Sequence, residues 1–190
     1  NKQALLDFAL AGPLLGMLLS AALMVTGLQL TLNMDSEAFR ALPQLPVAFL
    51  YQSSLGGGIV EAVLGRGVLD VSDPITSTIH LHPFTIAGLA SLLVNALALL
   101  PFGRTDGGRI STALLGRTGG QLVSLICAAV LLITGLFFSD ALLFYFSFVL
   151  FFESELEIPL KNEVDDVDFS RVIAATATAV LVLLTVIPIV

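Results

Sequence analysis

The strongest candidate for chemistry in this chain is Asp106, a carboxylate in the segment Pro101-Phe-Gly-Arg-Thr-Asp-Gly-Gly-Arg109, which directly follows an apolar run. Pro101 disfavours helix at the preceding residue and cannot donate a backbone hydrogen bond, so we expect an extended break there, shielded by protein. Gly107 and Gly108 permit close approach of the backbone. The pattern therefore predicts a broken helix, with Asp106 at or near the start of its second part.

Two interpretations of Asp106 follow from these surroundings. Ionisable residues at membrane depth are rare and usually functional, and a carboxylate on a broken helix beside water suits a metal ligand. Alternatively, Asp106 is the N-cap of the following helix and pairs with Arg104 or Arg109. The residue types and their spacing leave this choice open.

Other polar residues near this segment also allow two interpretations each. Asn95 lies in the apolar run before the break, where it could form an interhelical hydrogen bond or contact a substrate. His80 and His82 could bind a metal as a His-x-His pair, or form a polar pair at the membrane interface. No third ligand lies near the two histidines in the sequence.

The composition indicates that lipid surrounds much of the chain. The 190 residues are 56% hydrophobic and 12% charged, whereas soluble domains have about 25% charged residues. The net charge of −7 comes largely from residues 153–168 and argues against nucleic-acid binding, which needs a basic surface. Cys127 is the single cysteine, so neither an internal disulfide nor a cysteine-based metal cluster can form.

Apolar runs long enough to cross a bilayer organise the chain, because a spanning helix needs about 20 such residues. The residues Ala11-Gly12-Pro13 and Gly16 are expected to break the start of the first run. A fifth run, residues 141–152, is short and suits either a tilted pass or the second half of a hairpin. The sequence therefore predicts an all-α, polytopic transmembrane bundle with helices over residues 8–31, 84–100, 120–137 and 172–189.

Two segments connect these runs outside the hydrocarbon region. Residues 33–73 contain prolines, three successive glycines and scattered charges, and irregular backbone of this kind cannot face lipid. We expect an extramembrane or interfacial connection there. Residues 153–171 are expected to form an acidic, solvated loop. A regulatory or metal-binding role is the alternative, although the run has no liganding pattern such as a calcium-binding loop.

The segment around Asp106 resembles the Leu-Asp-Gly motif of the site-2 protease family, M50. Three other segments resemble parts of that family in order and spacing. They are Ala9-Leu-Ala-Gly-Pro-Leu-Leu-Gly16, His82-Pro-Phe-Thr-Ile-Ala-Gly88 and Glu157-Ile-Pro-Leu-Lys-Asn-Glu-Val164, the last being similar to the plastid and cyanobacterial branch. The ordered set is more specific than any one segment.

This resemblance implies a function and a partial metal site. Residues 1–190 would form the C-terminal part of one membrane-embedded peptidase domain that cleaves transmembrane segments of other proteins. Asp106 would be the third ligand of one Zn²⁺, supported by Pro101, Gly107 and Gly108, and Asn95 would contact substrate. The resemblance also implies a multi-pass membrane protein in the chloroplast, with a prokaryotic membrane as the alternative.

The chain also differs from the family pattern. It contains no His-Glu-x-x-His, the motif that supplies two zinc-binding histidines and a general base, so the remaining ligands would lie before Asn1. Ala98 occupies the position of the family's asparagine, and Thr105 that of its usual leucine. These differences support an alternative function, a proteolytically inactive homologue that acts as a membrane binding or chaperone-like partner.

Overall fold

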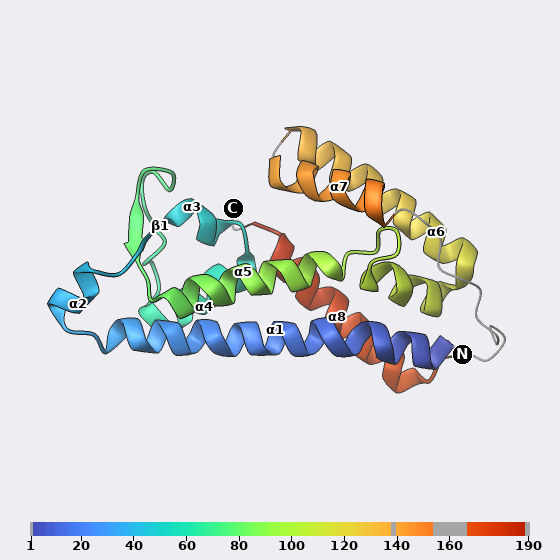
Figure 1. The fold of residues 1–190 in the computed structure, drawn as a ribbon, viewed down its shortest axis with the longest axis horizontal. Helices are drawn as coiled ribbons and strands as arrows, with labels where there is room; N and C mark the ends of the chain where they lie inside the picture. Colours follow the sequence, from blue (N-terminus) through green and yellow to red (C-terminus); the bar gives the residue numbers. More distant parts are fainter. Residues whose placement is uncertain (1, 138–139, 154–166, 189–190) are drawn as a thin grey trace. The chain divides into compact units, whose positions relative to one another are not determined.

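The computed structural model describes residues 2–137, 140–153 and 167–188 (Figure 1). The described residues form helices with one small antiparallel sheet of two three-residue strands, which confirms the predicted all-α class. In chain order the elements are α1 (Lys2–Leu32), α2 (Ser36–Arg40), β1 (Gln44–Pro46), α3 (Val47–Tyr51), α4 (Ser54–Leu64), β2 (Thr78–His80), α5 (Pro83–Ala98), α6 (Asp106–Phe137), α7 (Asp140–Phe152) and α8 (Phe169–Val186).

Three of the described helices, α1, α6 and α8, are long and apolar enough to cross a membrane. They contain most of the predicted spans 8–31, 120–137 and 172–189, although residue 189 lies outside the described residues. The predicted break at the start of the first span is wrong, since α1 continues through Pro13. Transmembrane helices tolerate proline because neighbouring groups satisfy the freed backbone carbonyl.

The other two apolar runs form shorter helices. Helix α5 has 16 residues and ends at Ala98, two residues before the predicted end of its span, so it extends only about 24 Å. Helix α7 has 13 residues. It runs back along α6, because a Cβ added to Gly135 would lie 2.8 Å from the backbone nitrogen of Leu143 (Figure 1). Residues 141–152 are thus the second half of a hairpin.

The chain forms two compact units, and α1, α5 and α8 contribute to both. The first unit comprises Asn1–Pro13 and Ala98–Ala179, and it contains Asp106. The second comprises Leu14–Leu97 and Val180–Val190. Residues 154–166, which include most of the predicted acidic loop and the Glu157–Val164 segment, lie outside the described residues. The end of that predicted loop is helical, because α8 begins at Phe169.

The second unit has a core in which the connection after α1 folds against α1 and α5. Strand β1 pairs with β2, with Gln44 opposite His80, and Ser53 caps α4 by accepting a hydrogen bond from the Gly56 amide at 2.9 Å. Whether this connection lies outside the bilayer stays a prediction. The core consists of Met24, Leu28, Val47, Leu50, Val60, Leu69, Leu81 and Leu89.

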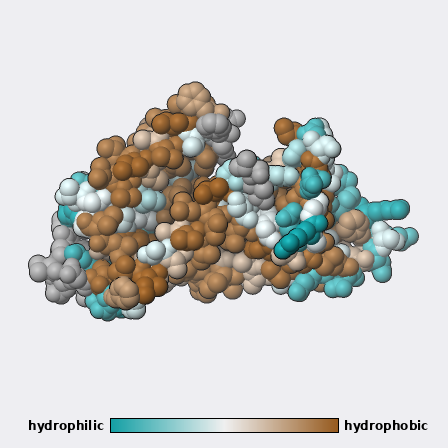
Figure 2. Space-filling view, turned by 180° about the vertical axis from the view of Figure 1, so that it is seen from behind, coloured by the Kyte–Doolittle hydropathy of each residue, from teal (hydrophilic) through white to brown (hydrophobic). Residues whose placement is uncertain are grey.

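Many large hydrophobic side chains lie on the surface instead of in a core. Phe8 of α1 is 71% exposed and Leu125 of α6 is 68% exposed. Figure 2 shows hydrophobic residues over much of the surface on one face. Soluble monomers rarely expose large contiguous apolar patches, so this surface fits a lipid environment and the fold is that of a polytopic membrane protein.

Candidate functional site

The predicted break lies between Ala98, where α5 ends, and Asp106, where α6 begins. The start of α6 at Asp106 is as predicted. The break is not extended, however, because Gly103 has a φ of +63° and the Phe102 amide donates to the Leu100 carbonyl at 2.8 Å. A left-handed glycine reverses the chain, so the segment forms a compact turn. Its residues from Pro101 onward are buried or half-buried, which confirms the expected shielding.

Neighbouring helices hold this turn at three points. The Gly103 amide donates to Ser124 Oγ of α6 at 2.9 Å. The Arg104 amide donates to the carbonyl of Glu153, just after α7, at 2.6 Å. The ring of Phe102 stacks on Phe146 of α7, with centroids 5.6 Å apart. The α6–α7 hairpin therefore fixes the turn that precedes Asp106.

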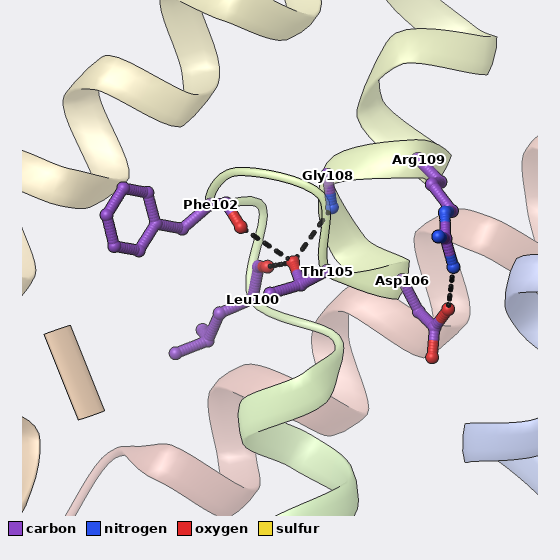
Figure 3. Close-up of polar contacts among 6 residues, drawn as sticks. All are labelled: Leu100, Phe102, Thr105, Asp106, Gly108 and Arg109. Atoms are coloured by element: carbon purple, nitrogen blue, oxygen red, sulfur yellow. Dashed lines mark hydrogen bonds and ion pairs between the residues drawn. The ribbon is translucent and has the colours of Figure 1, made fainter. Parts of the chain in front are cut away.

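Thr105, not Asp106, is the N-cap of α6. The Thr105 carbonyl accepts the first helical hydrogen bond, from the Arg109 amide at 3.0 Å. Thr105 Oγ1 accepts from the Gly108 amide at 3.2 Å (Figure 3). This is the geometry of an N-cap side chain bonded three residues ahead. The N-cap interpretation of Asp106 is therefore wrong, and its carboxylate is not used to cap the helix.

Gly107 and Gly108 bring the first turn of α6 against the preceding turn. A Cβ added to Gly107 would overlap the Leu99 carbonyl, and one added to Gly108 would overlap the Gly103 carbonyl. Real Cβ atoms do not approach backbone atoms so closely, so any larger residue would force the two turns apart. The expectation of close backbone approach at these glycines is confirmed.

The Asp106 side chain is 28% exposed and pairs with Arg109, with Oδ1 and Nη1 3.2 Å apart. This ion pair is the one that the alternative interpretation expected. Figure 3 shows Asp106 directed away from the Thr105 hydroxyl, with its second carboxylate oxygen in none of the drawn contacts. A carboxylate at the first residue of a helix is stabilised by the positive end of the helix dipole. Asp106 thus places a carboxylate, an oxygen ligand suited to a cation, at the first residue of α6.

A second break, which the sequence reading missed, divides α6 at Gly116. This residue has φ +71° and ψ −179°, a conformation open essentially to glycine alone. The chain folds back there, because a Cβ added to Gly120 would lie 2.9 Å from the Cα of Thr112. Asp106 thus begins a short helix that ends at Leu115, and the spanning part of α6 follows it. In the sequence, Gly116 followed by the charged Arg117 is the feature that could have indicated this break.

Asn95 lies at the contact between α1 and α5 in the second unit. Its Nδ2 donates to the Ser91 carbonyl of its own helix at 2.8 Å. A Cβ added to Gly16 of α1 would lie 2.9 Å from Asn95 Nδ2. Small residues allow such close helix packing in membranes. This placement favours the packing interpretation, and a substrate contact at Asn95 stays a prediction.

The two histidines also belong to the second unit. The ring of His80 lies against Phe39, with centroids 5.2 Å apart, and His80 Nε2 is 3.3 Å from Gln44 Nε2. His82 Nδ1 accepts a hydrogen bond from the Phe84 amide at 3.1 Å, at the start of α5. No group of three or more metal-binding side chains occurs among the described residues. The described residues therefore do not form a complete zinc site, and Asp106 as a zinc ligand stays a prediction.

An ion pair within the first unit joins the start of α1 to the start of α8. The guanidinium of Arg171 donates to both carboxylate oxygens of Asp7, at 2.8 and 2.9 Å. It also donates to Asp168 at 2.5 Å. The sequence reading missed this pair because 164 residues separate its members. It lies at helix ends, where charged side chains can remain in water.

Comparison with known proteins finds relatives that are named as probable zinc metalloproteases or metallopeptidases. The chain is 31% identical over its whole length to "Probable zinc metalloprotease EGY1, chloroplastic" of Arabidopsis thaliana, covering 33% of that protein. It is 33% identical over 90% of its length to "Probable zinc metallopeptidase EGY3, chloroplastic" of the same plant, covering 30% of it. It is 30% identical over 87% of its length to "Probable zinc metalloprotease EGY2, chloroplastic" of Oryza sativa subsp. indica, covering 28%.

The chain thus spans about a third of the length of these curated relatives. No solved structure matches it. The sequence model described as "Peptidase family M50" matches residues 1–142, a range that includes the Asp-Gly-Gly segment. This match confirms the resemblance read from that segment, and the chain belongs to peptidase family M50.

Proposed function

We propose that this chain is the C-terminal part of a zinc-dependent intramembrane endopeptidase, which cleaves transmembrane segments of other membrane proteins. The observation that carries the proposal is the Asp106 carboxylate, held at the first residue of α6 on a helix break shielded by protein. Membership of a peptidase family and relatives named as probable zinc metalloproteases support it. Their names also support a chloroplast membrane as its location, with a prokaryotic membrane as the alternative.

Asp106 would supply one oxygen ligand to the zinc. Catalytic zinc sites normally have three protein ligands and keep one position open for water or substrate. The described chain offers a single ligand, so the other two would come from residues outside the described part. When bound, zinc polarises a carbonyl and lowers the pKa of a bound water. The role of Asp106 would be to hold the cation, and its ion pair with Arg109 uses one of the two carboxylate oxygens.

A second candidate function rests on a separate observation. This chain has Ala98 and Thr105 at positions where the family pattern has asparagine and leucine. Such changes beside Asp106 favour a homologue that has lost peptidase activity. Such a protein would bind membrane proteins without cleaving them, as a binding or chaperone-like partner.

The test uses the longest natural protein that contains this chain, purified in detergent. Wild type is compared with Asp106→Asn, which keeps the size of the side chain but removes its negative charge. Arg109→Gln removes the Asp106 ion pair and keeps the carboxylate. Asp35→Asn is the matched control, because Asp35 is exposed and makes no capping hydrogen bond. Bound zinc and cleavage of a transmembrane substrate are measured for each.

We expect Asp106→Asn to lose zinc and cleavage, while Arg109→Gln and Asp35→Asn keep both. Equal zinc content and cleavage in wild type and Asp106→Asn would show that Asp106 is not a ligand. The wild type could instead bind no zinc and cleave nothing, yet retain transmembrane proteins in a pull-down. That result would contradict the peptidase function and support the binding or chaperone-like function.

A further inference from the structure

We infer that Thr105 is a positioning residue, whose hydroxyl fixes the Asp106 carboxylate as a zinc ligand. The inference rests on the proposed function of Asp106. The family's usual leucine at this position has no hydrogen-bonding group, so the role belongs to this chain's own residue. Thr105 would touch neither zinc nor substrate and would act only through Asp106.

The Thr105 hydroxyl joins the turn before α6 to the first turn of the helix. Its oxygen lies 2.7 Å from the Leu100 carbonyl oxygen and 2.9 Å from that of Phe102 (Figure 3). A hydroxyl has one hydrogen, so it donates to one of these carbonyls at a time. The same oxygen accepts from the Gly108 amide at 3.2 Å. One side chain therefore connects both sides of Asp106.

The first turn of α6 needs such a connection because of its composition. Asp106 is followed by Gly107 and Gly108, and glycine is the poorest helix former after proline. These glycines cannot be replaced by better helix formers, since a Cβ on either would overlap a backbone carbonyl. The close packing that requires glycine at these two positions therefore lowers the intrinsic stability of the first turn of α6. The Thr105 cap offsets that weakness at the residue adjoining Asp106.

Positional order at Asp106 matters for metal binding. A functional site works when its ligands are held within about 0.5 Å of the productive geometry by neighbouring hydrogen bonds. Arg109 contacts one oxygen of the carboxylate, but it belongs to the same turn and moves with it. The Thr105 hydroxyl links that turn to the Leu100–Phe102 segment, which the α6–α7 hairpin holds in place. Losing it should loosen the ligand without unfolding the protein.

The experiment compares two substitutions at Thr105 in the longest natural protein containing the chain. Thr105→Val keeps the shape and removes the hydroxyl, whereas Thr105→Ser keeps the hydroxyl. Ser53→Ala is the matched control. Ser53 also caps a glycine-rich helix, through the Gly56 amide at 2.9 Å, but it lies in the other unit. Zinc affinity is measured by chelator competition below the unfolding temperature, with the visible spectrum of the cobalt-substituted protein as a second readout.

We expect Thr105→Val to weaken zinc binding by about 10- to 100-fold, the range found when partners of metal ligands are removed. Its cobalt spectrum should change, and kcat should fall with KM nearly unchanged. Thr105→Ser should restore all three. Ser53→Ala should lower thermal stability and leave zinc affinity and the cobalt spectrum at wild-type values.

Three outcomes would overturn the inference. Thr105→Val could bind zinc as tightly as wild type while Asp106→Asn binds none, which would leave the proposed function intact. Ser53→Ala could weaken zinc binding as much as Thr105→Val, which would reduce Thr105 to a general contribution to stability. If the wild-type protein binds no zinc, both the proposed function and this inference are wrong. A measurement on the wild type alone is enough to recognise this outcome.

Discussion

The substitution Gly107→Ala tests whether the first turn of α6 is pressed against the preceding turn. Sequence alone favours a stabilising effect, because alanine in a helix is about 1 kcal/mol better than glycine. The structure reverses this sign. A Cβ on Gly107 would overlap the Leu99 carbonyl, and the carbonyl carbon of Leu100 would lie 2.5 Å away.

The expected loss of stability in Gly107→Ala follows from the atoms that the added Cβ would meet. The obstructing groups are backbone, which cannot rotate aside as a flexible side chain can, so the cost lies near the upper end of the about 1–3 kcal/mol typical of overpacking. Subtracting the helix-propensity gain leaves a net destabilisation of about 2 kcal/mol. For a chain of this size that corresponds to a melting temperature lower by about 4–8 °C.

Thermal unfolding in detergent, followed by circular dichroism, measures this change. Gly58→Ala is the control, because Gly58 lies within α4 and a Cβ there meets nothing within 4 Å among the described residues. It should raise stability by about 0.5–1 kcal/mol. If Gly107→Ala raised the melting temperature as Gly58→Ala does, the close contact between the two turns would be refuted.

Two further predictions concern the breaks and ends of the helices. Gly116→Ala meets no atom within 4 Å but must adopt φ +71°, so it should lose about 1–3 kcal/mol of stability through backbone strain alone; unchanged unfolding would contradict the break in α6. Asp7→Asn and Arg171→Gln, made singly and together, should show favourable coupling at low salt that decreases as salt rises, because the pair is partly exposed. No coupling at low salt would mean that α1 and α8 are not joined there.

Much of the fold is readable from composition because lipid imposes simple rules on the chain. A run of about 20 apolar residues in a bilayer must be helical, since backbone groups have no water to bond. The spans at α1, α8 and the second part of α6 follow from that rule. The rule fails at α5 and α7, where helices of 16 and 13 residues are too short for the full span.

The local character of the Asp106 segment was likewise readable from residue types. Pro101 ends a helix by a covalent property, and two glycines after Asp106 signal close backbone approach wherever they occur. The form of the break was not readable in the same way. Gly103 takes a left-handed conformation because its amide and that of Arg104 find acceptors at Ser124 and Glu153, which lie well beyond it in the sequence.

The sequence by itself determined that the chain is helical and lipid-facing, that a helix begins at Asp106, and which family pattern the segment follows. Only the tertiary structure decided that Ser124 and Glu153 hold the turn before Asp106. It also decided that Asn95 packs against α1 and that Asp7 pairs with Arg171. The physical reason is the range of each interaction. Helix propensity and hydropathy act within one segment, whereas a hydrogen-bond acceptor, a packing partner or a counter-ion is supplied by whichever segment folding brings alongside.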